Sequence, residues 1–414
     1  MKRVLLLLPT SSYRNDDFLA AARRIGVEIV AANNYCHQLA PAWGMGPIMA
    51  LHFDQPAQAA ETVLREINGP LDGVLAVDDS GVELAALLCE RLGLPGNPAP
   101  AVRLLRDKLL FRRLLADKGC AHPAFRHLPT GEDPRSLLSE LTFPVVVKAR
   151  RLSASCGVIR ADDAASLMEA VARVRAIQGR SDRDAAALGI VVEDFIPGSE
   201  YALEGILAHG ELTVLALFDK PDPLDGPFFE ETLYITPSRL PAAIQARIHD
   251  EVARVCRAAG LVTGPIHAEM RVNAEGVWML EVAPRSIGGL CGRILEHLLG
   301  MSLEALILRH LVGDPLPLAA ASDGAGVMMI PIPRHGVFDR VQGVAAAQAV
   351  PGVTGVTITA QAGQSLSPPP AGSSYLGFIF ARAASPEVAE AALRQAHAQL
   401  RFEIRTGLPV AATA

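Results

Sequence analysis

The run GPIHAEMRVNAEGVWMLEVAPR, residues 264–285, constrains the fold of this chain more than any other segment. Apolar residues flank a turn at residues 273–276, which predicts two antiparallel strands. Glu269 lies on the first strand and Glu281 on the second. Unpaired buried carboxylates are costly and facing like charges destabilise a strand pair, so this pair indicates a bound Mg²⁺ or a shared proton. The alternative is an exposed hairpin with both carboxylates in solvent.

The register of this hairpin tests the metal hypothesis. A simple four-residue turn would pair residues 272 and 277, and that register puts Glu269 and Glu281 on opposite faces. A shared cation therefore requires a bulge, or a connection of three or five residues. Arg285 follows the second carboxylate, where a phosphate or a substrate carboxylate could lie.

Composition limits the class of protein. The 414 residues are too many for one core, so two to four domains or subdomains are expected. The 38 basic residues are balanced by 44 acidic ones without a block of like charge, which argues against nucleic acid and membrane surfaces as main partners. Pro9 ends the first apolar run, and no later run reaches the roughly 20 residues of a membrane helix. The six cysteines show no C-x-x-C pairing, which favours a reducing cytoplasm.

The first 95 or so residues alternate strand and helix patterns, which predicts a parallel sheet. The expected elements are residues 4–8, 16–25, 27–31, 73–77 and 82–92. No G-x-G-x-x-G follows the first strand, which weakens a dinucleotide-binding interpretation. Residues 94–98 close this unit and open one helix over 101–118.

The rest of the chain predicts mixed α+β structure. Two strands separated by a polar loop over residues 143–159 precede a helix at 164–177 and a surface loop at 179–184, and three strands follow within 190–218. A Pro- and Gly-rich loop is expected at 219–237 and a helix at 242–259, before the hairpin. Further helices are expected around 287–299 and 303–311, then a strand at 374–381 and a helix at 386–400 capped by Ser385.

Lys148 ends the apolar strand FPVVVK, so its ammonium would be held at a fixed point. The small residues 149–157 that follow, ARRLSASCG, suit phosphate oxygens through free backbone N–H groups. The alternative is an ordinary hairpin turn. Lys108, on a helix among arginines, is by itself typical of a solvated lysine.

The stretch VVEDFIPGSEY, residues 191–201, leaves a strand, breaks at Pro197 and Gly198, and returns with Glu200. Such a hinge offers backbone groups to an adenine edge and a carboxylate to ribose hydroxyls. The alternative is a turn between two strands.

In this order, the motifs resemble the ATP-grasp superfamily over roughly residues 98–313. The resemblance implies an α/β protein, α+β in parts, with a parallel N-terminal domain (1–97), a linker helix and lid (98–189), a catalytic subdomain built on an antiparallel sheet (190–313) and a C-terminal α+β unit (314–414). It implies ATP, with Mg²⁺ or Mn²⁺ bound by Glu269 and Glu281. The nucleotide-binding residues it implies are Lys108, Lys148, Ser153, Ser155, Gly157, Glu193, Asp194, Phe195, Ile196 and Glu200.

Two positions depart from the family pattern. Ala283 stands where the family commonly has an Asn that adds a metal ligand, which leaves the number of metal ions open. Ala149 replaces the usual Pro after Lys148. Within the superfamily, APRSIGG at 283–289 and the C-terminal SYLGFIFARA resemble the L-amino acid ligases that make dipeptides and the carnosine synthase group.

The resemblance implies an ATP-dependent carboxylate-amine ligase that forms an amide through an acyl phosphate, with Lys148 and Arg285 as catalytic residues. Its alternatives are an ATP-grasp carboxylase or formyl-phosphate enzyme and a non-catalytic nucleotide-binding protein. Expected substrate contacts are Glu231, His267, Arg285, Ser286, Gly288 and Gly289. For Glu231 a plain surface loop, and for His267 a hydrogen-bonded structural role, stand as alternatives. The expected partners are small molecules, and a homodimer is left open.

Overall fold

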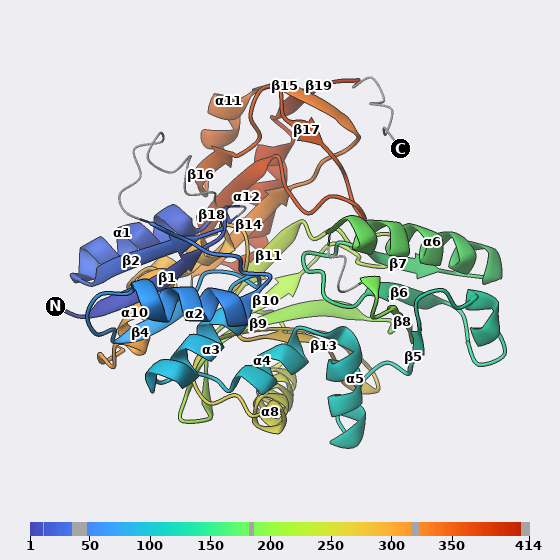
Figure 1. Ribbon diagram of the computed structural model, residues 1–414. Coiled ribbons are helices and arrows are strands. Elements are labelled where there is room, and N and C mark those ends of the chain that lie inside the picture. The colour runs from blue at the N-terminus through green and yellow to red at the C-terminus, as the bar shows by residue number, and fades with distance from the viewer. Residues whose placement is uncertain (11, 35–47, 182–185, 317–322, 407–414) are drawn as a thin grey trace.

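The computed structural model describes residues 1–10, 12–34, 48–181, 186–316 and 323–406. The structure has four parts (Figure 1): an N-terminal domain in blue, a lid in green, a large central sheet and a C-terminal unit in orange and red. Residues of all four parts line one cavity. None of the helices in the described ranges is long and apolar enough to cross a membrane.

The N-terminal domain contains the four-stranded parallel sheet that the sequence predicts. In the order β3-β2-β1-β4, its strands are Arg3–Leu8 (β1), Glu28–Asn33 (β2), Met49–Ala50 (β3) and Gly73–Ala76 (β4), and its helices are Asn15–Ile25 (α1), Pro56–Glu66 (α2) and Val82–Leu92 (α3). Parallel strands present their carboxyl ends at one edge, so the turns after β1 and β4 lie together and carry residues 12–14 and 78–80 to the cavity.

The expected single helix over 101–118 is wrong. The structure has two helices, Ala99–Leu105 (α4) and Lys108–Asp117 (α5). Asp107 interrupts the helix because its side chain accepts hydrogen bonds from the backbone N–H groups of Leu109 and Leu110, as an N-cap does. Lys108 therefore starts a helix instead of lying within one.

The lid is a four-stranded antiparallel sheet backed by one long helix. In the order β5-β8-β6-β7, its strands are Phe125–Leu128 (β5), Ile190–Asp194 (β8), Val145–Ala149 (β6) and Val158–Ala161 (β7), with Pro134–Leu137 (η2) and Ala164–Ser181 (α6) beside them. The helix runs four residues past the predicted end at 177, into the expected loop at 179–184, of which 182–184 lie outside the described residues. The lid sheet extends to Asp194.

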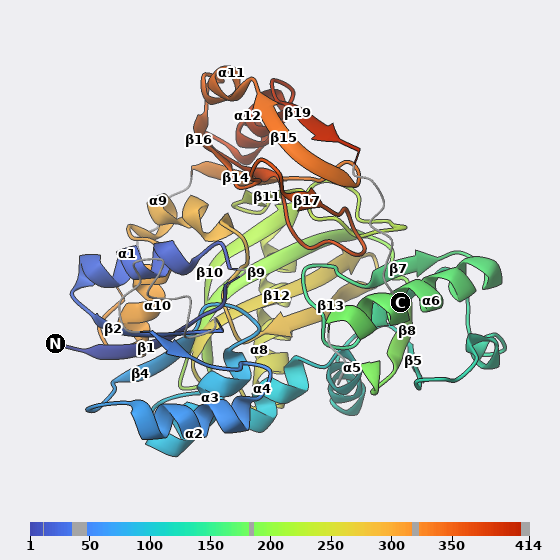
Figure 2. The same ribbon diagram turned by 45° about the horizontal axis from the view of Figure 1, so that its top comes forward.

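The central sheet has eight strands and continues from the catalytic part into the C-terminal unit (Figure 2). In the order β13-β12-β9-β10-β11-β14-β18-β16, the strands are Gly276–Ala283, Gly264–Asn273, Ser199–Ala208, Glu211–Lys220, Leu233–Thr236, Gly324–Ile330, Gly377–Ala383 and Val353–Ile358. The expected loop at 219–237 is partly wrong, because it contains β11, whose LYIT residues are all buried. The helix Ala242–Ala259 (α8) has the predicted bounds and packs on β10 and β13.

The hairpin of β12 and β13 contains the bulge that metal binding requires. Asn273 pairs with Gly276 at the turn, and the register shifts between Glu269 and Met270. Glu269 is consequently the direct partner of Glu281, so both carboxylates point to the same face of the sheet.

The predicted helix around 287–299 is shorter than expected, because its first residues form a turn. The structure has Cys291–Leu295 (η3), Glu296–Leu299 (α9) and Leu303–Leu311 (α10). The C-terminal unit adds a small sheet and two helices: Ser365–Leu366 (β17), Gly336–Gln342 (β15), Arg401–Arg405 (β19), Val344–Gln348 (α11) and Pro386–His397 (α12). Ser385 caps α12 as predicted, accepting from Val388 N–H, whereas β18 begins three residues later than expected.

Candidate functional site

One cavity of about 380 Å³ lies between the four parts, and it collects the predicted site residues from segments far apart in the sequence. The lining residues that the sequence predicts are Lys108, Lys148, Ser153, Ser155, Glu193, Asp194, Phe195, Ile196, Glu200, Glu231, His267, Glu269, Glu281, Arg285, Ser286, Gly288 and Gly289. Gly157 is the exception, because it does not line the cavity and its N–H donates to Pro370 O at 2.9 Å. Glu230, beside Glu231, does not line it either.

Lys148 belongs to a buried cluster with more positive than negative charge. Arg112 donates to both oxygens of Glu193 at 2.8 and 3.1 Å, and the Lys148 ammonium contacts the same carboxylate. Burial would raise the pKa of Glu193, but the two cations lower it to about 2. With its carboxylate fully engaged, Glu193 positions Lys148 instead of offering that carboxylate to an adenine.

The loop after Lys148 has an unusual backbone. Ala154 and Ser155 both have positive φ, 52° and 53°, and both line the cavity with Ser153. A non-glycine residue in the left-handed region costs about 1–3 kcal/mol, so it is typical of functional sites. Lys108 reaches the loop by donating to Leu152 O at 2.6 Å. Small side chains here leave the loop backbone accessible to an anion.

Phe195 lies at the hinge between lid and central sheet. The guanidinium groups of Arg160 and Arg271 lie 4.4 and 4.8 Å from its ring centroid. The cavity at this end is otherwise largely apolar, being lined by Pro123, Val146, Val158, Ile196, Phe229 and Leu280. A planar heteroaromatic base fits such a slot, since it needs apolar contact on its faces and few polar groups at its edge.

On the central sheet, three carboxylates surround one lysine, and Arg271 links this cluster to Phe195. Lys220 donates to Glu200 at 2.9 Å, to Glu231 at 2.5 Å and to Glu269 at 3.1 Å. Burial opposes the charge of Lys220, but the carboxylates raise its pKa well above the usual value. One oxygen from each carboxylate lies within 4.8 Å of the others, a spacing that could hold a metal ion. In this structure the ammonium already neutralises part of that charge.

The carboxylate of Glu200 is buried and already paired with two cationic side chains. Besides Lys220, Arg271 donates to it at 3.3 Å, and the residue is 9% exposed. Its place at the ribose therefore stays a prediction, with two cations competing for its oxygens.

The predicted metal pair has room for a cation. Lys220 and His267 both donate to Oε1 of Glu269, and neither bond reaches Oε2. The contact of Glu281 with Lys108 is longer, 3.9 Å between Nζ and Oε2. Two carboxylates facing each other in register, with exposed oxygens in a cavity, have the donor chemistry that Mg²⁺ prefers.

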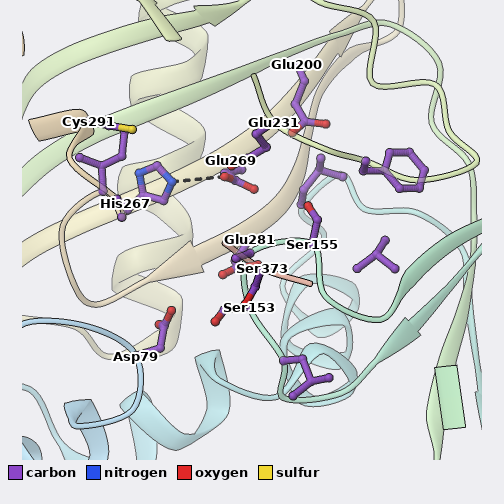
Figure 3. Close-up of a pocket in the computed structure, with 18 of the residues that line it drawn as sticks. Asp79, Ser153, Ser155, Glu200, Glu231, His267, Glu269, Glu281, Cys291 and Ser373 are labelled. Atoms are coloured by element: carbon purple, nitrogen blue, oxygen red, sulfur yellow. Dashed lines mark hydrogen bonds and ion pairs between the residues drawn. The ribbon is translucent and has the colours of Figure 1, made fainter. Parts of the chain in front are cut away.

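His267 is a buried link between two carboxylates (Figure 3). Its Nδ1 lies 3.2 Å from Glu204 Oε2 and its Nε2 3.3 Å from Glu269 Oε1. Burial would lower the pKa of His267, yet the carboxylates raise it to about 9. Glu204 also accepts from Ile287 N–H at 2.9 Å. These contacts match the structural alternative for His267, although the ring also lines the cavity.

Arg285 is held by the N-terminal domain. Its Nε and Nη2 donate to Oδ2 of Asp79 at 3.0 and 2.9 Å, and its Nη1 donates to Ser286 O at 3.2 Å. A guanidinium has five N–H donors, so two remain for the cavity. Arg14 fixes the next residues by donating to Ser286 Oγ at 2.7 Å and Ile287 O at 2.9 Å.

Several residues of the site were missed from the sequence. Lys220, which does not line the cavity but contacts three of its carboxylates, ends the apolar run VLALFDK just as Lys148 ends FPVVVK, so the same signal was present. Asp79 follows a buried parallel strand at its carboxyl end, where ligands bind in open α/β sheets. Tyr375 and Ser373 carried no local signal, because only the return of the C-terminal unit to the cavity brings them there.

Comparisons with known proteins agree with this architecture. An ATP-grasp N-terminal domain matches residues 19–96, an ATP-grasp domain matches 141–294 and the L-amino acid ligase C-terminal domain 2 matches 328–405. The chain is therefore a member of the ATP-grasp family.

Within that family the chain is similar to amino acid ligases. The crystal structure of L-amino acid ligase from Bacillus licheniformis is 27% identical, with a TM-score of 0.79 over 98% of this chain and 99% of that one. Human carnosine synthase 1 is 28% identical over 68% of this chain but 36% of its own length. Alanine–anticapsin ligase of Bacillus subtilis (strain 168) is 25% identical over 70% of this chain and 65% of its own. The chain thus spans about a third of the human carnosine synthase.

Proposed function

We propose that this protein is an ATP-dependent carboxylate-amine ligase that joins two amino acids through an acyl phosphate. The observation that carries this proposal is the arrangement of charge around one cavity. Lys108 and Lys148 lie beside the small-residue loop, with the buried Arg112 behind Lys148 on the carboxylate of Glu193. Glu231 and Glu269 are held by Lys220. Glu281 lies between the two groups, 3.9 Å from Lys108 and in register with Glu269, and Arg285 also lines the cavity. Anionic phosphates and a cationic amino group would be drawn to different ends of the same space.

In this mechanism, Glu269 and Glu281 would hold Mg²⁺, which supplies charge neutralisation on the transferred phosphoryl group. Lys148 binds phosphate oxygens from the other side. The substrate carboxylate attacks the γ-phosphorus, the bond to the β-γ bridging oxygen breaks, and ADP leaves. Asp79 and Ser286 leave two N–H groups of Arg285 unused, and in this mechanism these would donate to the resulting anionic centre.

The second step forms the amide. The incoming amine attacks the acyl carbon, gives up a proton and expels phosphate. Glu231 is placed to hold the ammonium of the amino acid that supplies the carboxylate, because it lines the cavity and is tied through Lys220 to Glu269. An α-ammonium lies only one carbon from its carboxylate, so a carboxylate beside the metal pair brings the ammonium near Glu231.

The test is phosphate release with ATP and Mg²⁺ across pairs of amino acids, combined with mass spectrometry of the products. The expected result is phosphate release that depends on an amino acid, with one dipeptide formed per phosphate. The inactive control is Glu281→Gln. Phosphate release that depends on bicarbonate and yields no dipeptide would show that the protein is a carboxylase and not an amino acid ligase. Absence of ATP-dependent turnover with every pair, alongside tight ATP binding, would favour a non-catalytic protein.

A further inference from the structure

Residues 367–376 connect β17 to β18 and run from the C-terminal unit toward the lid and the central sheet (Figure 2). Their backbone is anchored at two separate places. Pro370 O accepts from Gly157 N–H of the lid loop at 2.9 Å, and Tyr375 N–H donates to the Tyr13 hydroxyl of the N-terminal domain at 3.4 Å. This segment, called the strap, therefore touches the lid and the N-terminal domain at once.

Two side chains of the strap line the cavity, Ser373 and Tyr375. Figure 3 shows Ser373 among the lining residues, in the same view as Ser153 and Glu281. The Tyr375 ring packs edge-on against Phe378, with 5.9 Å between ring centroids. Packing against a fully buried ring restricts the rotamer of Tyr375, so this part of the wall is preformed.

Neutral groups pack with Tyr375 in one apolar cluster and also line the cavity. They are Tyr13, Ile287, Cys291 and Met329. Burial raises the pKa of the Cys291 thiol far above its usual value, so the group stays a neutral, weakly polar surface. Burial, followed by the negative charge of Glu231, raises the pKa of Tyr375 as well, so its phenol stays protonated. An apolar side chain of a ligand fits such a wall better than a charged one.

The position of this wall relative to Glu231 gives it a role. The proposed function places the ammonium of the carboxylate-donating amino acid at Glu231, and the side chain of that amino acid leaves the same α-carbon. Tyr234 belongs to the same apolar cluster as Tyr375 and Cys291, and its ring centroid lies 5.1 Å from Lys220 Nζ, which contacts Glu231 at 2.5 Å. The neutral wall therefore lies near that carboxylate. The side chain of the bound amino acid then has the strap as its nearest boundary.

We propose that the strap completes the substrate subsite and that Tyr375 is a specificity-determining residue, which selects an apolar side chain of limited size on the carboxylate-donating amino acid. This proposal rests on the proposed function for the identity of the ligand. It adds that the C-terminal unit, and not only the ATP-grasp part, decides which amino acid is used.

The experiment compares wild type with Tyr375→Ala, Tyr375→Phe and Ser374→Ala. Ser374 belongs to the same strap but does not line the cavity, so it is the matched control. The kcat/KM ratio for L-phenylalanine against L-alanine as carboxylate donor is measured for each, with ATP saturating. Removing the ring should shift this ratio toward phenylalanine at least about tenfold, the scale on which pocket volume discriminates side chains. Tyr375→Phe and Ser374→Ala should keep the wild-type ratio, and the KM for ATP should stay within about twofold.

Calorimetry separates the failure of this inference from failure of the proposed function. Binding of the same two amino acids in the presence of MgADP gives an affinity ratio without turnover. If Tyr375→Ala has the wild-type unfolding midpoint and an unchanged affinity ratio, the role of Tyr375 is overturned even if dipeptide forms. A shifted ratio in a protein that forms no dipeptide overturns the ligase function alone. If Tyr375→Ala unfolds, Tyr375→Leu keeps apolar bulk against Phe378 and carries the same expectation with a smaller shift.

Discussion

The two buried clusters of charged side chains beside the cavity differ in their ratio of cations to carboxylates. At the lid end, called the positive end, Arg112 and Lys148 share the single carboxylate of Glu193. At the sheet end, called the negative end, Lys220 faces Glu200, Glu231 and Glu269, and Glu281 is the strand partner of Glu269. Arg271 is a second partner of Glu200, and His267 is a second partner of Glu269. The positive end thus has two cations for one carboxylate, whereas the negative end gathers four carboxylates, so we expect phosphates at the first and a cation at the second.

The largest effect should come from weakening the negative end. Glu281→Gln removes one of the two facing carboxylates and should reduce turnover by about three orders of magnitude, because a catalytic metal contributes several kcal/mol. ATP binding should fall far less. Steady-state phosphate release and calorimetric ATP binding measure the two. Glu275→Gln, exposed on the turn of the same hairpin, makes the same charge change and should retain full activity. Equal losses in both variants would contradict the metal role.

The positive end should depend on its carboxylate for stability. Glu193→Gln leaves Arg112 and Lys148 buried without a counter-charge and should destabilise the protein by about 3–5 kcal/mol. Because the pKa of Glu193 falls from its usual 4.5 to about 2 on folding, its contribution is present above pH 4.5 and is lost as the pH falls toward 2. The difference in free energy of unfolding between variant and wild type, measured by denaturant titration, should therefore become smaller as the pH falls from 4.5 toward 2.

The matched control for Glu193 is Glu140→Gln. Glu140 pairs with Arg126 at the lid surface, with 54% of its side chain exposed, and such pairs contribute under about 1 kcal/mol. A Glu193→Gln protein as stable as this control at neutral pH would show that the positive end does not need its carboxylate.

Arg285 connects the proposed chemistry to the N-terminal domain. Arg285→Ala should lower turnover about 10²- to 10³-fold with little change in ATP affinity, since the anionic centre that it stabilises is absent from the free substrates. Lysine should rescue poorly, because an ammonium cannot bind Asp79 and the substrate with a planar fork. Arg293→Ala, which removes a half-exposed partner of Asp17, is the control. Wild-type rates of dipeptide formation in both Arg285 variants would make that residue structural.

Lys148→Ala should have the smallest of these effects. Loss of a charge-assisted contact to phosphate should weaken ATP binding about 10- to 100-fold and lower turnover in parallel, because the ammonium meets phosphate before and during the reaction. Calorimetry and phosphate release are compared at 25 °C, after thermal unfolding has confirmed that the variant is folded. Turnover at the wild-type rate would show that Lys148 does not bind phosphate. The positive end would then have no demonstrated role in binding an anion.

Local sequence predicted many of the strands and helices and the types of residue at the site, although it missed strands such as β11. A lysine at the end of an apolar strand, small residues after it and glutamates on both strands of a hairpin are local patterns, because alternation within a strand sets which side chains share a face. The strand that FPVVVK predicts lies at Val145–Ala149, one residue past Lys148, and the helix Ala242–Ala259 has its predicted bounds. Counting residues predicted that metal binding needs a bulge or a connection of three or five residues, and the register has a bulge between Glu269 and Met270.

Only the tertiary structure decided how these residues share their charges. Lys220 meets carboxylates from β9, β12 and the loop before β11, Asp79 crosses from the N-terminal domain to Arg285, and Tyr375 returns from the C-terminal unit. These partners lie tens to hundreds of positions apart, and no periodicity relates them. The sheet order and the packing of four units set their distances, and distance and burial together set electrostatic energy. For that reason the residue types of the site could be predicted from the sequence, while the way in which they share their charges could not.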